Sequence, residues 1–207
     1  EISACLVGSE MCIRDRFVFN PIIGVINDAL ANLLNSMGST SKVILGIVLG
    51  GMMAIDMGGP INKAAYVFGT MSIANGNYDI MAAVMVGGMV PPIGIALATT
   101  FFKNRFSKSE RQSGITNYVM GLAFITEGAI PFAAADPLHV IPAAAVGAAV
   151  AGALSMVFGC TLMAPHGGLF VFPVVGNWPM YLVALAAGSV ITMFMLALLK
   201  KPVYKEN

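Results

Sequence analysis

The stretch GLAFITEGAIPFAAADP, residues 121–137, places one carboxylate, Glu127, in the middle of an apolar run. Gly128 and Pro131 follow it closely, and both residue types interrupt helices. An ionisable side chain inside a membrane costs about 2.5–3.5 kcal/mol unless it faces a polar cavity or a partner. Backbone that leaves the helix at that depth is tolerated only against protein or a water-filled cavity. The stretch therefore predicts that Glu127 lines a polar ligand site inside a membrane.

The composition of the chain is that of an integral membrane protein. Of its 207 residues, 57% are hydrophobic and 10% are charged, and the mean hydropathy is +0.83. Soluble domains carry about 25% charged residues. The net charge of +1 does not indicate nucleic-acid binding, and the basic residues gather in short clusters between apolar segments, as topology signals do. We predict a multi-pass protein in contact with the lipid bilayer, with no nucleic-acid partner.

The sequence offers no cofactor or metal site. Cys5, Cys12 and Cys160 show no paired spacing, which argues against a disulfide framework and against zinc. There is neither a P-loop nor a Gly-x-Ser-x-Gly elbow. We expect Cys160, which lies in an apolar run, to be a small buried side chain.

The first 37 residues divide into two segments of different character. Residues 1–16 hold two of the three cysteines and three of the ten acidic residues, and in this they differ from the rest of the chain. We interpret them as a non-native segment; the alternative is a genuine cytosolic linker or the end of an earlier loop. In residues 17–37, apolar side chains recur at helical spacing after Pro21. This pattern predicts an amphipathic helix in the membrane interface or against other helices.

Four apolar segments have the character of membrane-spanning helices, namely residues 43–57, 80–102, 137–162 and 178–199. Residues 103–111 contain four basic side chains, and Lys200, Lys201 and Lys205 close the chain. Both basic clusters are predicted to be cytoplasmic, with residues 204–207 as a tail.

An even number of crossings must separate two clusters that lie on the same side. The last two apolar segments supply those crossings only if the stretches around Glu127 and His166 are re-entrant hairpins. Counted backwards, the first two segments place Lys42 on the cytoplasmic side as well. We therefore expect an all-α membrane protein with about four transmembrane helices, an amphipathic helix and re-entrant hairpins.

Three polar breaks lie in glycine- and proline-rich backbone beside these spans. Asn62 and Lys63 follow the run GGP, residues 58–60; Glu127 forms the second break, and His166 opens the third in the run HGG. Broken helices enclosed by apolar segments are typical of transporter sites, although an ordinary surface turn with Lys63 in solvent is the alternative for the first. Together these groups suit a hydroxyl-rich ligand better than a metal ion.

Two polar residues at the next helix start have simpler interpretations. Asp136 precedes Pro137 and is expected to cap a helix. His139 comes shortly afterwards and is expected to be a satisfied helix-start residue rather than a ligand.

Three motifs in this order resemble the membrane component, enzyme IIC, of the fructose-type bacterial phosphotransferase system. They are GGPINKAAYVF at residues 58–68, FITEGAIPFAAADP at residues 124–137 and PHGGLF at residues 165–170. The resemblance covers residues 17–203, which it identifies as a truncated IIC transmembrane domain of the glucose-superfamily type. It implies a dimeric carrier in the bacterial inner membrane that takes up fructose for phosphorylation to fructose 1-phosphate.

The resemblance also implies the site residues and the partner. The Ile-Thr-Glu segment resembles the substrate-binding glutamate motif of the wider superfamily, which assigns sugar binding to Glu127. Asn62 and His166 are expected to contact the sugar. His166 is alternatively expected to help neutralise phosphoryl charge, and Lys63, in the same site, has that expected role. Gly59 and Gly167 are also expected in this site. The phosphoryl donor is expected to be a phosphocysteine on a cytosolic IIB domain.

The chain departs from the family pattern by its length. A complete IIC domain is longer, and no cysteine loop of the IIB type is present, so we expect this segment to form part of a phosphotransferase but to be inactive alone. Glu127 either only binds the sugar or also acts as a general base toward the attacking hydroxyl. Charge on the phosphoryl group favours the binding role.

Other functions share the same physical features. One alternative is an ion-coupled secondary transporter or facilitator with Glu127 as the coupling site, and another is a membrane scaffold without transport. Mannitol-type and mannosylglycerate-type carriers would also fit the pattern, and only the particular residues of the three motifs favour fructose.

Overall fold

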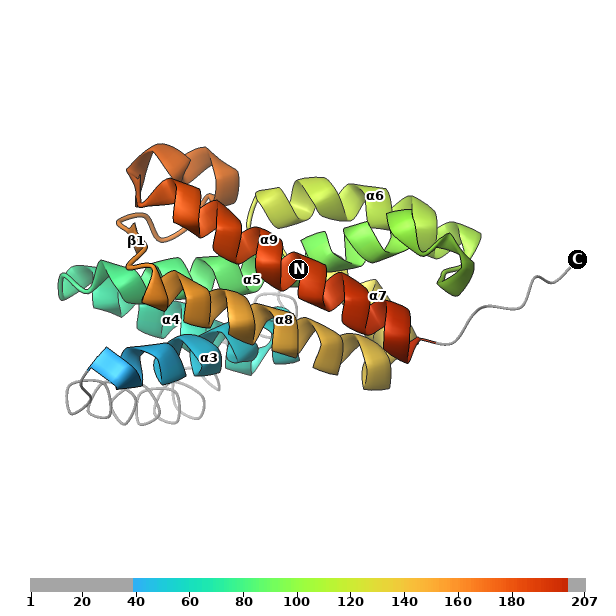
Figure 1. Ribbon diagram of the computed structural model, residues 1–207, viewed down its shortest axis with the longest axis horizontal. Coiled ribbons are helices and arrows are strands. Elements are labelled where there is room, and N and C mark those ends of the chain that lie inside the picture. Colours follow the sequence, from blue (N-terminus) through green and yellow to red (C-terminus); the bar gives the residue numbers. More distant parts are fainter. Residues whose placement is uncertain (1–38, 201–207) are drawn as a thin grey trace, which may run out of the picture. The chain divides into compact units, whose positions relative to one another are not determined.

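The computed structural model describes residues 39–200, with side chains from residue 42 onward, and most of this part is helical (Figure 1). The elements in chain order are α3 (Ser39–Ile55), α4 (Pro60–Ala74), α5 (Tyr78–Phe101), η2 (Lys103–Arg105), α6 (Lys108–Leu122), η3 (Thr126–Ala129), α7 (Ile130–Ala135), α8 (Pro137–Val157), β1 (Thr161–Leu162), η4 (Gly168–Val174), β2 (Val175–Gly176) and α9 (Trp178–Leu199). The interpretations of residues 1–16, 17–37 and 204–207 concern segments outside the described residues.

Helix α5 is the element against which the others pack. Its residues 80–92 are all buried, and it contacts α3, α4, α6, α8 and α9. A helix in that position is expected to be apolar on every side. Helices α5, α8 and α9 are long and apolar enough to cross a membrane, whereas the apolar part of α3, Lys42–Ile55, is shorter. The prediction of an all-α membrane protein is confirmed.

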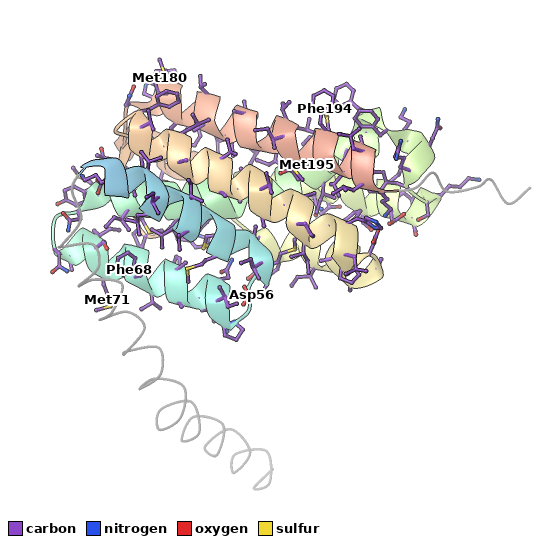
Figure 2. All side chains as sticks on the ribbon, turned by 60° about the horizontal axis from the view of Figure 1, so that its bottom comes forward. Asp56, Phe68, Met71, Met180, Phe194 and Met195 are labelled. Atoms are coloured by element: carbon purple, nitrogen blue, oxygen red, sulfur yellow. The ribbon has the colours of Figure 1, made fainter. Side chains whose placement is uncertain are left out.

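The outer faces of the bundle carry large apolar side chains. On α9, Met180 and Phe194 are 42% and 53% exposed (Figure 2). On α8, Leu138 and Val157 are 82% and 59% exposed. Exposed apolar surface on helices of membrane-spanning length fits contact with lipid.

Glycine residues bring α3 and α8 close together. A Cβ atom built on Gly46 would lie 2.5 Å from the carbonyl oxygen of Gly152, and one built on Gly50 would overlap the carbonyl oxygen of Ala148. The spacing Gly46-x-x-x-Gly50 therefore marks a close helix contact, as such spacing does in membranes.

The same contacts give the helix directions. Gly50 lies against Gly87, and Lys42 pairs with Asp79 at 2.6 Å, so α3 and α5 run parallel. Gly188 lies against Val90 and Gly94 against Thr192, so α9 also runs parallel to α5. The contacts of Gly46 with Gly152 and of Gly50 with Ala148 show that α8 runs antiparallel to α3. We call the end that holds Lys42 and Asp79 the Lys42 end, and the opposite end, where α5 and α9 terminate, the Lys200 end.

This arrangement shows that one part of the predicted topology is wrong. Lys42 was expected on the same side as the basic cluster of residues 103–111, but the two lie at opposite ends of α5. The reason is α4, whose 15 residues rise about 1.5 Å each and so carry the chain back along α3 by about 22 Å. Residues 43–57 thus form the first arm of a hairpin with α4, not an independent crossing.

The other part of the topology is confirmed at the Lys200 end. The Lys200 ammonium group lies 2.7 Å from the carboxylate of Glu110 and 4.5 Å from the ring centre of Phe106. Arg105 donates a hydrogen bond to the backbone carbonyl of Lys200. The cluster of residues 103–111 and the end of α9 therefore lie on the same side, separated along the chain by α8 and α9.

Adding a methyl group at Gly50 should disturb the contact between α3 and α8. Gly50→Ala is expected to lower the free energy of unfolding by about 1–3 kcal/mol because the new Cβ meets backbone. Nothing lies within 4 Å of a Cβ at Gly51, so Gly51→Ala should be neutral or stabilise by up to about 1 kcal/mol. Unfolding in mixed micelles, followed by the fluorescence of Trp178, compares the two. Equal effects at both positions would contradict the close contact.

Replacing Glu110 should give a pH-dependent loss of stability. Burial alone would raise the pKa of Glu110, but hydrogen bonds from Lys200 and Ser107 and the Lys200 charge together lower it from its ordinary 4.5. A carboxyl group with a lowered folded-state pKa stabilises the fold above its unfolded-state pKa, and this contribution is lost as the pH falls through the folded-state pKa. Glu110→Gln should therefore cost about 1–2 kcal/mol at neutral pH, and progressively less below pH 4.5. A difference between the proteins that does not change with pH would contradict this role.

Candidate functional site

The Glu127 segment forms a hairpin that enters from the Lys200 end. Helix α6 runs antiparallel to α5, with Gly114 against Thr99 and Gly121 against Ile93. The chain turns through η3, and α7 leads to α8, which starts again at the Lys200 end. The prediction that this segment turns back, and does not cross, is confirmed.

One hydrogen bond fixes the tip of this hairpin to α5. The carbonyl of Gly88 would normally accept from the backbone three or four residues later, but those positions are Pro91 and Pro92, which have no N–H group. The hydroxyl of Thr126 donates to this carbonyl instead, at 3.0 Å. A buried carbonyl left without a donor would cost about 1–3 kcal/mol, so the proline pair creates an acceptor that the hairpin tip satisfies.

The end of α6 contains a strained residue, Phe124. Its backbone is left-handed, with φ 62°, and the amides of Phe124 and Ile125 donate to Gly121 and Met120 at 3.2 and 2.8 Å, which is the Schellman pattern. In this conformation a residue with a side chain costs about 1–2 kcal/mol. The equivalent position after α8 is Gly159, with φ 61°. Sites of strain of this kind cluster at functional positions.

The first break is the reversal between α3 and α4, and hydrogen bonds from its own side chains hold it in place. The carboxylate of Asp56 accepts from the backbone amides of Ile61 and Asn62, at 2.7 and 2.9 Å. The Asn62 amide group donates to the carbonyl of Met53 at 2.7 Å. Asp56 thus provides the acceptor for the free backbone amides at the start of α4, and Asn62 provides a donor for a free carbonyl near the end of α3. Figure 2 shows Asp56 at this turn.

Gly58 brings this reversal against Glu127. It has φ 117°, and a Cβ atom there would lie 3.0 Å from Cγ and 3.1 Å from Oε1 of Glu127. The positive φ and the absent side chain both favour glycine. The carboxylate of Glu127 therefore lies directly over the backbone of the first break, at Gly58.

The third break enters from the Lys42 end, between β1 and η4. The pairing of Thr161 with Gly176 closes the base of the loop. At its tip, a Cβ atom on Gly168 would overlap the carbonyl oxygen of Leu122, at the end of α6. The predicted re-entrant course around His166 is confirmed, and its tip meets the hairpin that comes from the opposite end.

The three breaks enclose one open cavity of about 610 Å³, within the range of small-molecule sites. Its lining residues are Met53, Gly58, Asn62, Lys63, Tyr66, Phe124, Ile125, Thr126, Glu127 and His166. Three aromatic rings form one side of the cavity. The ring centres of Phe124 and His166 are 5.2 Å apart, and the ring centre of Tyr66 lies 6.2 Å from that of Phe124 and 6.5 Å from that of His166. Within residues 42–200, Glu127 has no ion pair, so its carboxylate faces the cavity without a fixed partner.

The structure brings four of the six predicted site residues together. Glu127, Asn62, Lys63 and His166 line the cavity. Gly59 and Gly167 do not line it. A Cβ atom on Gly59 would meet the side chain of Asp56, and one on Gly167 would meet the side chain of Val171. Their assignment to a ligand site stays a prediction.

Sequence reasoning missed the aromatic side of the cavity and its anchor. Tyr66, Phe124 and Thr126 all lie inside the family motifs of residues 58–68 and 124–137, but their residue types alone did not distinguish them from membrane packing. The proline pair in α5 was the usable signal for Thr126, since it predicts a carbonyl in need of a donor.

The remaining interpretations have mixed outcomes. His139 is satisfied at the start of α8, with Nδ1 2.6 Å from the Asp136 carboxylate. Asp136 occupies the cap position but makes no side-chain hydrogen bond to the helix backbone, so its predicted capping role is wrong. Cys160 is fully buried, as predicted, but it lies after the end of α8 and not inside a span.

Comparison with known proteins finds relatives by sequence. No family model matches the chain, and no solved structure matches it. The fructose permease IIC component of Bacillus amyloliquefaciens is 56% identical over 191 residues, which are 92% of this chain and 62% of the relative. The PTS system fructose-specific EIIABC component of Bacillus subtilis is 56% identical over 92% of this chain and 30% of its own length. The EIIB′BC component of Escherichia coli is 46% identical over 97% of this chain and 36% of its own length.

These relatives are longer than the chain. It spans 30–62% of the length of the three proteins. The matched share of this chain, 92–97%, leaves few of its residues outside the similarity.

The Thr126 hydroxyl should be required for the position of the hairpin tip. Thr126→Val keeps the shape but removes the donor to Gly88, and it should lower the free energy of unfolding by about 1–3 kcal/mol. Thr126→Ser keeps the donor and should cost under about 1 kcal/mol. Hydrogen exchange of residues 122–129 should increase in the valine variant alone. Equal exchange in the valine and serine variants would contradict the anchor.

Proposed function

We propose that this chain, which belongs to the membrane (IIC) components of fructose-type phosphotransferase systems, supplies the sugar site of a fructose permease in the bacterial inner membrane. The sugar would be passed to a partner domain and released as fructose 1-phosphate. The observation that carries this proposal is the Glu127 carboxylate, which faces a cavity built from three broken segments and has no fixed partner among the described residues.

The lining of the cavity suits a neutral, hydroxyl-rich ligand. A carboxylate accepts short, charge-assisted hydrogen bonds from hydroxyl groups. The rings of Tyr66, Phe124 and His166 offer apolar faces to the C–H groups of a sugar, and Lys63 adds a donor. The names of the relatives support fructose as the ligand.

Asn62 would act mainly by positioning its neighbours. Its amide group already donates to Met53 and its backbone amide to Asp56, which leaves the side-chain carbonyl for a ligand. The sugar would thus contact a side chain whose orientation is already fixed, and such preorganisation lowers the entropy lost on binding.

The phosphoryl donor would be a IIB domain on the cytoplasmic side. Cys160 is fully buried and cannot accept a phosphoryl group from a protein partner. The names of two relatives include B units, which supports such a partner. By the positive-inside rule the Lys200 end faces the cytoplasm, so the hairpin that carries Glu127 enters from the side of the donor. In the whole permease we propose a homodimer.

Glu127 would bind the sugar and not remove its proton. Two negative groups at contact distance repel each other, so a carboxylate beside the incoming phosphoryl group would raise the barrier. The hydrogen bonds to sugar hydroxyls located away from the phosphoryl group have no such penalty.

Glu127→Gln tests both the site and this role in the full-length permease with its IIB domain. Loss of charge-assisted hydrogen bonds should weaken fructose binding by about 10–100-fold, while phosphorylation at saturating fructose stays within about threefold of wild type. Fructose binding and fructose-dependent phosphoryl transfer are the measurements.

Asp136→Asn is the matched control. This carboxylate lies on the same hairpin but outside the cavity, and its loss should leave fructose affinity unchanged. Normal fructose affinity together with a normal saturated rate in Glu127→Gln would overturn the sugar site. A large fall in the saturated rate with normal affinity would assign the base role instead.

A further inference from the structure

A second cavity lies at the Lys200 end and shares no residue with the Glu127 cavity. Its volume is about 470 Å³, and it forms where α5 ends and α6 begins. Its lining residues are Thr99, Thr100, Lys103, Lys108, Arg111, Gln112 and Ile115. Three cations and no carboxylate therefore face one hollow.

The positive charge of this hollow is not neutralised by the part of the chain that the structure describes. Lys103, Lys108 and Arg111 make no ion pair there. The adjacent carboxylate, Glu110, is held by Lys200 at 2.7 Å and by the backbone amide of Ser107 at 2.7 Å. Cations that line a concave surface focus a positive potential into it, so the hollow favours an anionic ligand.

One uncharged group, the Gln112 amide, also favours a ligand rich in acceptor oxygens. The Thr99 and Thr100 hydroxyls already donate to the carbonyl of Ala96, at 2.9 and 2.8 Å, so the uncharged donor left in the hollow is the exposed Gln112 amide group beside the cations. Arg and Lys donors together with an amide group suit the oxygens of a phosphate.

An apolar stripe leads from this hollow along α6. Ile115, Val119 and Leu122 follow Arg111 on one face of the helix, at intervals of three or four residues, and are 66%, 70% and 37% exposed. Because α6 runs from the Lys200 end toward the middle of α5, the stripe begins at the membrane interface and continues into its apolar depth. The face thus presents cations at the headgroup level and hydrocarbon-compatible side chains below.

We propose that this hollow binds the phosphate of an anionic phospholipid, with one acyl chain along Ile115, Val119 and Leu122. Basic pockets at the cytoplasmic side of membrane helices bind such headgroups. A free phosphate would use the cations alone, whereas only a lipid would also cover the stripe. Since α6 continues directly into Phe124 and the hairpin tip, the lipid would brace the element that carries Glu127.

The test uses the full-length protein in nanodiscs of phosphatidylglycerol and phosphatidylcholine mixtures, with retained lipid measured by native mass spectrometry. Wild type should retain phosphatidylglycerol preferentially. The triple variant K103Q/K108Q/R111Q should bind phosphatidylglycerol about 100-fold more weakly than wild type. K42Q, which removes an exposed cation at the opposite end, should retain it. Equal retention by the triple variant and wild type, or no preference for phosphatidylglycerol, would overturn the proposal.

Two further measurements distinguish a lipid from free phosphate, and the first uses a variant that keeps every cation of the hollow. The variant I115S/V119S keeps every cation, and it should lose the preference for long-chain over short-chain phosphatidylglycerol. Inorganic phosphate at millimolar concentration should not raise the melting temperature of the lipid-stripped protein. Stabilisation by inorganic phosphate together with an unchanged chain-length preference in I115S/V119S would show a free-phosphate site and reject the lipid.

Discussion

The hydrogen bond from Thr126 to Gly88 is the interaction on which the cavity depends. Pro91 and Pro92 remove the two backbone donors that the Gly88 carbonyl would use, and the Thr126 hydroxyl replaces them. A carbonyl in the middle of a buried helix cannot turn to water, so the hairpin tip is held where the acceptor is. The position of Glu127, one residue farther along, follows from this bond. The strain at Phe124 is then the cost of turning the chain sharply enough to reach it.

Much of this architecture could be predicted from the sequence. The Gly-Gly-Pro, Glu-Gly and His-Gly-Gly breaks mark backbone that cannot continue as helix, and the cost of an isolated carboxylate in lipid points to a shared cavity. The basic clusters indicated the side on which α9 ends. These inferences rest on strong local penalties, which act in the same way wherever a segment lies in the fold.

The parts that could not be predicted depend on how helices pack against one another, which the local sequence does not show. Whether residues 60–74 turn at once or return as a helix depends on packing against α3 and α5, so the predicted side of Lys42 was wrong. The same limit applies to Tyr66 and Phe124. The sequence pattern of an aromatic residue in an apolar helix is the same whether the side chain contacts lipid, a neighbouring helix or a ligand. Asp56 and Asn62 show a different case, because polar side chains in the first break also close the turn that carries them.

The order in which the cavity walls occur along the chain has a consequence for synthesis. Residues 53–66 supply one wall, residues 124–127 the next, and His166 the last, while the contact between Glu110 and Lys200 spans 90 residues. The first reversal closes through its own neighbours and can form as soon as it is made. The hairpin tip finds its acceptor 38 residues back, before α8 and α9 exist. A nascent chain that stops short of residue 166 therefore has its carboxylate in an unfinished cavity, and the loop between α8 and α9 adds the last wall when His166 is made.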